Sequence, residues 1–121
     1  MKTALVTGGS RGIGSAIALA LGNNFHVVVG FANSEDKANN VVKEIVAAGG
    51  SASTVQIDIS NAESVDNAFT TIEKEYNSVD VLINNAGVTQ DNILPRMKED
   101  EWLEVIQTNL TGSFYTSQRA I

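Results

Sequence analysis

The sequence predicts an α/β fold in which helices cover both faces of a parallel sheet. Short runs rich in β-branched residues, at 4–6, 27–29, 53–57 and 79–83, alternate with longer segments of helical period. The runs are apolar on both faces, which is typical of parallel strands buried between helices. Because crossovers between parallel strands are right-handed, the simplest topology is the first half of a doubly wound, Rossmann-type sheet with strand order 3-2-1-4. Residues 1–121 are predicted to form one domain.

The helical segments are recognised by apolar residues that return every three or four positions. Ser34 is predicted to cap the second helix, and Ser60 with Glu63 forms a capping-box pattern before the third. Gly22 and Gly49-Gly50 mark the predicted ends of the first two helices. The predicted core-facing stripes are Ile13, Ile17 and Leu21; Ala38, Val42, Ile45 and Val46; Val65, Phe69, Ile72 and Tyr76; and Trp102, Ile106, Leu110 and Phe114.

Composition and charge exclude several classes of function. The net charge of −6 argues against nucleic acid or an anionic membrane surface as the main partner. No apolar stretch is long enough to span a membrane, and no targeting signal is visible. The chain contains no cysteine, which excludes disulfides and a thiol nucleophile and accords with a cytoplasmic location. No metal site is predicted, because the acidic residues at 91 and 99–101 are expected to complement a helix dipole.

A glycine-rich turn links the first predicted strand to the first predicted helix. Gly8 lets the chain turn tightly, Gly12 lets backbone approach a pyrophosphate, and Gly14 lets the helix pack closely on the strand. The helix start then offers free amides and a positive dipole end to the anion. Glycines also punctuate purely structural loops. The position between a strand and an amphipathic helix favours nucleotide binding.

Four motifs together resemble those of the short-chain dehydrogenase/reductase family. They are the spacing Thr7-Gly8-x-x-x-Gly12-x-Gly14, the pair Asp58-Ile59, the tetrapeptide 84–87 (Asn-Asn-Ala-Gly) and Asn109, in the family's order. The resemblance covers the whole chain and implies an oxidoreductase with a nicotinamide cofactor. It also implies that Asp58 holds the adenine ring through its side chain. The residues predicted to bind the cofactor, from the motifs and from their positions, are Thr7, Gly8, Ser10, Arg11, Gly12, Ile13, Gly14, Asn33, Ser34, Asp58, Ile59, Asn85, Ala86 and Gly87.

The residues around the second predicted strand favour NADP(H) over NAD(H). An acidic residue at the end of that strand would bind a ribose 2′-hydroxyl and repel a 2′-phosphate, but no carboxylate occurs there before Glu35. Arg11 is placed to meet a 2′-phosphate, as a basic residue does in the NADP-dependent members that the chain resembles. Asn33 and Ser34 add neutral hydrogen-bonding groups. The alternative is that Arg11 is a solvated surface residue.

Within the family, residues 84–102 resemble the active-site loop and following helix of bacterial 3-oxoacyl-[acyl-carrier-protein] reductases. Gln90 departs from that pattern, since arginine is common at this position. The resemblance implies NADPH-dependent reduction of a 3-oxoacyl thioester to the 3-hydroxyacyl form in fatty acid synthesis, with acyl carrier protein or CoA carrying the substrate. It also implies a homo-oligomer. Acetoacetyl-CoA reduction and other short-chain dehydrogenase substrates remain open.

Most of the family's catalytic residues are absent from the 121 residues. The family's reaction uses a serine and a Tyr-x-x-x-Lys pair, and the sequence stops at Ile121 before the position of either. Asn109 is the one catalytic residue that the resemblance assigns to this chain. Tyr115 and Arg119 have the spacing of the missing pair, but packing and surface roles are expected for them. His26, the only histidine, is expected to be structural. The chain alone is therefore expected to be inactive, and a non-catalytic nucleotide-binding or self-associating module is the alternative function.

Overall fold

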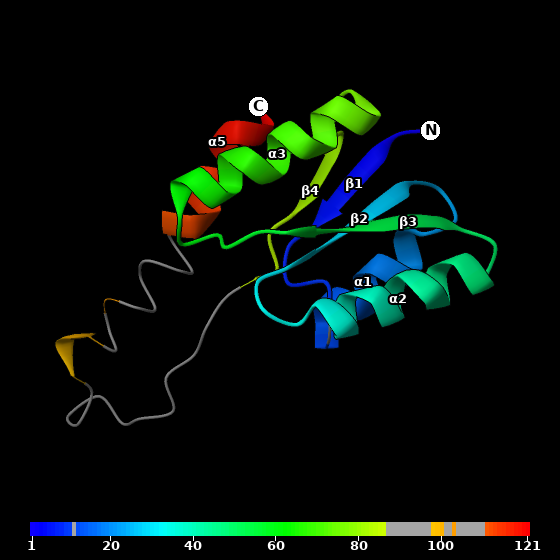
Figure 1. Cartoon of the computed structure of the whole chain (residues 1–121), viewed down its shortest axis with the longest axis horizontal. Helices are drawn as coiled ribbons and strands as arrows, with labels where there is room; N and C mark the ends of the chain where they lie inside the picture. The colour runs from blue at the N-terminus through cyan, green and yellow to red at the C-terminus, as the bar shows by residue number, and fades with distance from the viewer. Residues whose placement is uncertain (11, 87–97, 101–102, 104–110) are drawn as a thin grey trace.

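The computed structural model describes residues 1–10, 12–86, 98–100, 103 and 111–121 (Figure 1). Within this part of the chain, one sheet has the strand order β3-β2-β1-β4, and every neighbouring pair is parallel. The predicted topology of a partial Rossmann-type sheet is thereby confirmed. The strands are β1 (Thr3–Val6), β2 (His26–Phe31), β3 (Ser51–Gln56) and β4 (Val81–Ile83).

The two inner strands carry the most completely buried side chains. Leu5 pairs with Val28 on one side and with Leu82 on the other, so that β1 lies at the centre of the sheet. Successive residues of a strand face opposite sides, and both sides are covered by helices. Val27 and Val29 therefore face one core cluster while Val28 faces the other. β3 and β4 form the two edges of the sheet and are only partly buried.

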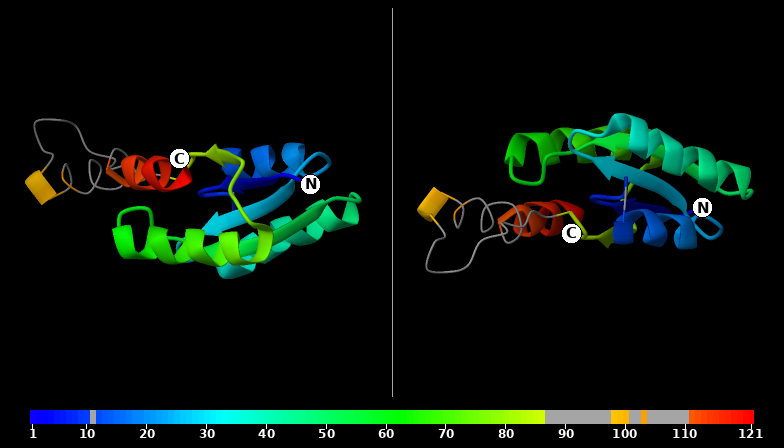
Figure 2. Two further views of the ribbon diagram at one scale, coloured as in Figure 1. Left: turned by 90° about the horizontal axis from the view of Figure 1, so that it is seen from above. Right: turned by 90° about the horizontal axis from the view of Figure 1, so that it is seen from below.

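Of the helices that the structure describes, two lie on each face of the sheet, above and below it in Figure 1, and Figure 2 shows the molecule from these two sides. On one face, α1 (Gly12–Leu21) and α2 (Glu35–Ala47) pack through Ala18, Ala38, Val41 and Ile45. On the other, α3 (Ala62–Tyr76) buries Val65, Ala68, Phe69 and Ile72 beside α5 (Gly112–Ala120). The two clusters form the core of the domain, one on each face of the sheet.

Several predicted core positions are wrong. Ile13, Val46 and Phe114 are 75%, 54% and 58% exposed, although the spacing predicts each of them in an apolar stripe. In α1, the residues against the sheet are Gly14 and Ala18, because the helix packs too closely there for a large side chain. In α2 the buried stripe is Ala38, Val41 and Ile45, with Val42 at its margin. The predicted stripe positions Trp102, Ile106 and Leu110 lie outside the described residues.

The predicted capping box of Ser60 and Glu63 before α3 is wrong, because the helix is capped one residue later. The N-cap is Asn61, whose side-chain oxygen accepts a hydrogen bond from the Ser64 amide at 3.0 Å. Ser60 instead donates through its hydroxyl to Asp58 Oδ1 at 2.6 Å. At α2, Ser34 occupies the predicted N-cap position, but its side chain makes no capping hydrogen bond.

Arg119 joins α5 to α3. Its guanidinium donates to both carboxylate oxygens of Glu73, at 3.0 and 2.6 Å, and to Asp66 at 2.9 Å. The hydrogen bonds that Arg119 donates to these two carboxylates raise the pKa of Arg119, and the bonds that Glu73 accepts lower the pKa of Glu73. The guanidinium also lies 5.7 Å from the ring centre of Phe69. Arg119 is thus a partly exposed surface arginine, as expected, and its ion pairs also link the two helices.

His26, at the start of β2, is held on three sides. Its Nδ1 lies 2.6 Å from Ser51 Oγ, its Nε2 lies 3.0 Å from Ser53 Oγ, and its ring stacks on Tyr76 at 4.2 Å. Burial lowers the pKa of His26, while the Glu75 carboxylate acts in the opposite direction. The imidazole thus fastens the amino ends of β2 and β3 to the end of α3. This is a structural role, as the sequence indicates.

Acidification is expected to destabilise the domain partly through His26. The unfolded chain takes up the histidine proton near a pH of about 6.5, and the folded chain takes it up at lower pH. The folded state therefore binds fewer protons in this window, so the free energy of unfolding decreases as pH falls from about 7 to about 5. Urea unfolding across that range should give a shallower pH dependence for His26→Gln, which keeps a hydrogen-bonding side chain without a titration. Equal slopes for the two proteins would contradict this role of His26.

Candidate cofactor-binding site

The carboxyl ends of the four strands meet at one edge of the sheet, where ligands bind in open α/β folds. Thr7 and Gly8 follow β1, and Asn85 follows β4, the strand beside it. Asn33 and Asp58 follow β2 and β3. The topology thus brings most of the predicted cofactor-binding residues in the described part of the chain to this edge.

Thr7 connects the turn after β1 to the turn after β4. Its side chain is completely buried, and its Oγ1 donates to the Ile83 carbonyl at 3.2 Å. The same oxygen accepts hydrogen bonds from the backbone amides of Asn85 and Ala86, each at 3.1 Å. One threonine hydroxyl therefore fixes the backbone of both turns.

The glycines of the turn are required by close contacts and by backbone conformation. Gly8 and Gly12 have φ values of +63° and +60°, which favour glycine. A Cβ on Gly14 would lie 2.2 Å from the Gly8 carbonyl oxygen and 2.5 Å from Asn85 Nδ2. Asn85 Nδ2 donates to that same carbonyl at 3.1 Å. The start of α1, the turn and the Asn85 side chain are consequently packed without room for one more methyl group.

The first turn of α1 has the features of an anion-binding helix start. It contains no acidic residue, whereas α2 and α3 have Glu35 and Glu63 there. A Cβ on Gly12 would meet nothing within 4 Å, so the outer side of the turn is open. The helix amides and the helix dipole favour a negative group at such a position. The residues present thus fit a phosphorylated cofactor. The exposed Ile13 and the half-buried Ser10 lie in the same turn.

The predicted adenine-binding pair divides into an exposed and a buried residue. Asp58 is exposed, and its Oδ1 accepts from the Ser60 amide at 3.0 Å and from the Ser60 hydroxyl at 2.6 Å. Ile59 is 5% exposed and belongs to the core cluster under α3. Only Asp58 therefore offers its side chain to a ligand, and any contribution of Ile59 would come from its backbone.

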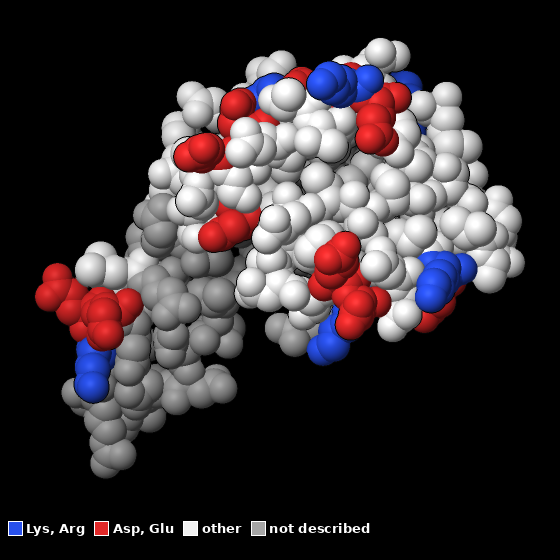
Figure 3. All heavy atoms as spheres, viewed as in Figure 1, with Lys and Arg blue, Asp and Glu red and all other residues white. Residues whose placement is uncertain are grey.

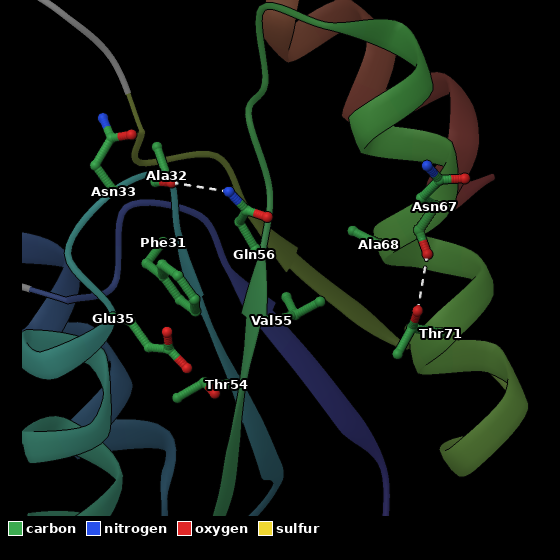
Figure 4. Close-up of a pocket in the computed structure, with 10 residues that line it drawn as sticks. All are labelled: Phe31, Ala32, Asn33, Glu35, Thr54, Val55, Gln56, Asn67, Ala68 and Thr71. Carbon is green, nitrogen blue, oxygen red and sulfur yellow. Dashed lines mark hydrogen bonds between the residues drawn. The ribbon is translucent and has the colours of Figure 1, made fainter.

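A hollow of about 680 Å³ lies along β3, an edge strand (Figure 4). Asn33 and Glu35 line it from the α2 side, and Asn67 and Thr71 line it from α3. Its position separates it from the glycine turn, and of the predicted cofactor residues only Asn33 reaches it. The hollow is therefore a rival location for a ligand.

Positive and negative side chains are mixed on the surface. On the face in Figure 3, lysine and arginine side chains are interspersed with aspartates and glutamates, with no continuous basic patch among the residues described there. No helix of the described chain is long and apolar enough to cross a membrane. The described residues also contain no group of three or more His, Asp or Glu side chains able to hold a metal ion.

Three predicted site residues, Arg11, Gly87 and Asn109, lie outside the described part of the chain. One contact near the site is not predicted by the sequence. Asn84, which follows β4, is held by α5 through Thr116 and Ser117. The place of Asn84 in the 84–87 motif is visible in the sequence, but the helix that meets it is not, because no local pattern specifies such a contact.

Nearly the whole sequence matches one known family. The family model described as short chain dehydrogenase matches residues 2–121. The chain belongs to the short-chain dehydrogenase family, as the four motifs predicted.

Individual relatives of the chain are named for one activity. The chain is 48% identical over 119 residues to the 3-oxoacyl-[acyl-carrier-protein] reductase FabG of Staphylococcus epidermidis, covering 98% of the chain and 49% of that protein. It is 50% identical over 114 residues to a 3-oxoacyl-[acyl-carrier-protein] reductase of Synechocystis sp., covering 93% and 46%. Identity to FabG of Vibrio cholerae is 42% over 120 residues, covering 99% and 48%. The chain spans about half the length of these curated relatives.

Proposed function

We propose that this chain is the cofactor-binding half of an NADP(H)-dependent 3-oxoacyl-[acyl-carrier-protein] reductase. The single observation that carries the proposal is the packed turn at Gly8, Gly14 and Asn85, at the carboxyl edge of a parallel sheet. The names of the relatives support the substrate class, a 3-oxoacyl thioester on acyl carrier protein, and a CoA thioester is the alternative carrier. When bound, the nicotinamide supplies a hydride to the carbonyl carbon.

The roles of the residues follow from their positions. Gly12 and the start of α1 bind the pyrophosphate, and Asp58 binds the adenine through its exposed carboxylate. Asn85 and Ala86 fix the floor of the site through Thr7. Asn109 contributes a backbone carbonyl that holds a water of the proton relay, a role carried over from the family. The serine and the Tyr-x-x-x-Lys pair that complete the reaction are proposed to lie beyond residue 121. The complete enzyme is proposed to be a cytoplasmic homo-oligomer.

The second candidate function is nucleotide binding without catalysis by the 121 residues alone. Arg119, the cation four residues after Tyr115, is engaged by Glu73 and Asp66, which favours a structural role for that pair. Protein of verified intact mass should be mixed with NADPH and an acetoacetyl thioester, and NADPH oxidation followed by absorbance. We expect NADPH binding without turnover. Turnover by a verified 121-residue species would contradict the assignment of catalysis to the missing segment, and absence of NADPH binding would contradict both functions.

Arg11→Ala is expected to discriminate between the two nicotinamide cofactors. Loss of a charge-assisted contact to the 2′-phosphate should raise the dissociation constant for NADPH by roughly 10-fold or more. The constant for NADH should change by less than about threefold, because NADH lacks that phosphate. Lys74→Ala, on α3, is the matched control for the loss of one positive charge. Equal effects of Arg11→Ala on both cofactors would remove Arg11 from the NADP(H) assignment.

A further inference from the structure

The amide side chain of Asn84 is held at both of its ends by α5. The Thr116 hydroxyl lies 2.6 Å from Asn84 Oδ1, and Asn84 Nδ2 donates to Ser117 Oγ at 3.1 Å. Thr116 is completely buried, whereas Asn84 is exposed. The strand end after β4 is thus attached to a helix that lies about 30 residues further along the chain.

The hydroxyl proton of Thr116 has a clear preferred partner. Its Oγ1 also lies 3.1 Å from the Ser113 carbonyl and 3.3 Å from the Gly112 carbonyl, the usual local acceptors for a threonine within a helix. One hydroxyl donates only one proton, and the contact to Asn84 is the shortest. The hydroxyl therefore joins two elements of the fold where a local helix contact was available.

Only one peptide bond separates this contact from the proposed cofactor site. Asn85 follows Asn84, donates through its side chain to the Gly8 carbonyl and through its backbone to Thr7. A continuous connection thus runs from Thr116 through Asn84 and Asn85 to the glycine turn. Because Asn85 is packed against Gly8 and Gly14, a small shift of Asn84 would displace a wall of the site.

We propose that Thr116 is a positioning residue for the nicotinamide-cofactor site, acting through Asn84. The proposal rests on the function proposed above, in which Asn85 and Ala86 form part of that site. Thr116 touches no cofactor in this role; it fixes the direction in which the chain leaves β4. Because Asn84 is exposed, we expect water to hydrogen-bond to its Oδ1 when the Thr116 hydroxyl is removed. The substitution should therefore lower the stability little and act mainly on the geometry of the site.

The test compares Thr116→Val, which removes the hydroxyl and keeps the shape, with Thr116→Ser, which keeps the hydroxyl. Thr71→Val serves as the control for stability and amide exchange alone, since that hydroxyl donates to the Asn67 carbonyl within α3, away from the glycine turn. Thr116→Val should weaken NADPH binding roughly 10-fold, with a loss of thermal stability no greater than that of Thr71→Val. Thr116→Ser should bind NADPH within about threefold of the starting protein. In a double-mutant cycle on NADPH affinity, Thr116→Val should add little to Asn84→Ala, because Asn84→Ala already removes the contact to Thr116 together with the contact to Ser117.

Amide hydrogen exchange supplies a readout that needs no cofactor. The amides of Asn85 and Ala86 donate to Thr7, and Thr116→Val should accelerate their exchange while Thr71→Val leaves it unchanged. Unchanged exchange in Thr116→Val would overturn the positioning role even if the starting protein bound no NADPH. Absence of NADPH binding together with accelerated exchange would instead support the positioning role and contradict the proposed function. Normal NADPH affinity in Thr116→Val, or additive effects with Asn84→Ala, would also overturn the proposal.

Discussion

Gly14→Ala is expected to destabilise the domain and to abolish useful cofactor affinity. The new Cβ would lie 2.2 Å from the Gly8 carbonyl oxygen and 2.5 Å from Asn85 Nδ2, so both must move. Overpacking of this kind costs about 1–3 kcal/mol, against which the better helix propensity of alanine returns up to about 1 kcal/mol. Because the amides that receive the pyrophosphate would be displaced, the association constant for NADPH is expected to fall on the order of 100-fold. Urea unfolding and isothermal titration measure the two effects.

Gly49→Ala is the control that separates a general loss of stability from the steric clash at Gly14. Gly49 has φ +91°, a Cβ at this position would meet nothing within 4 Å, and the residue lies after α2, far along the chain from the turn. Its replacement should lower stability by about 1–2 kcal/mol through backbone strain alone and leave NADPH affinity unchanged. If Gly14→Ala bound NADPH as well as Gly49→Ala does, close packing at the glycine turn would be irrelevant to binding.

Thr7→Val is the second substitution with a large expected effect. It removes the buried acceptor of two backbone amides, those of Asn85 and Ala86. The Asn85 amide also donates to the Ile83 carbonyl at 3.1 Å and keeps that acceptor. The loss of the Thr7 oxygen therefore affects mainly the Ala86 amide. An unsatisfied buried donor costs about 1–3 kcal/mol, and that is the expected decrease in the free energy of unfolding. NADPH affinity should fall by roughly 10-fold as the turn after β4 moves.

Thr7→Ser distinguishes the hydroxyl from the methyl group. Serine keeps the oxygen that receives both amides and loses one buried methyl, so we expect a stability loss of about 1 kcal/mol and little change in NADPH binding. Denaturant unfolding and NADPH titration of the two variants provide the comparison. Indistinguishable results for valine and serine would contradict the role given to the hydroxyl.

The arrangement of the fold was predictable because strands buried on both faces have a strong composition signal. Runs such as Val27-Val28-Val29, separated by helical segments, permit few topologies once crossovers are right-handed. The detailed faces of the helices were less predictable. Ile13 has the spacing of a core residue, but the close approach of Gly14 to Gly8 turns the helix so that Ile13 is exposed. Asn61 replaces Ser60 as a cap because Ser60 is bound to Asp58, a competition between local hydrogen bonds.

The glycine turn was visible in the sequence because its residues are close together and their types have a mechanical reason. The links that hold the site in place were not. Thr7 meets Asn85 across 78 residues, and Asn84 meets Thr116 across 32. Sequence periodicity reports which face of an element is buried, but it does not report which hydroxyl meets which amide across the sheet. Such contacts follow from the three-dimensional packing alone.

The location of bound NADPH tests the account most directly. Backbone amide resonances of the 121-residue protein should be followed by NMR during titration with NADPH. We predict that the largest shifts fall on residues 7–14 and on Asn85 and Ala86, at the carboxyl ends of the strands. Ser51 and His26, at the amino ends of β3 and β2, should be unaffected. Shifts confined to the hollow along β3, at Thr54, Asn67 and Thr71, or the absence of shifts at the glycine turn, would contradict the central claim.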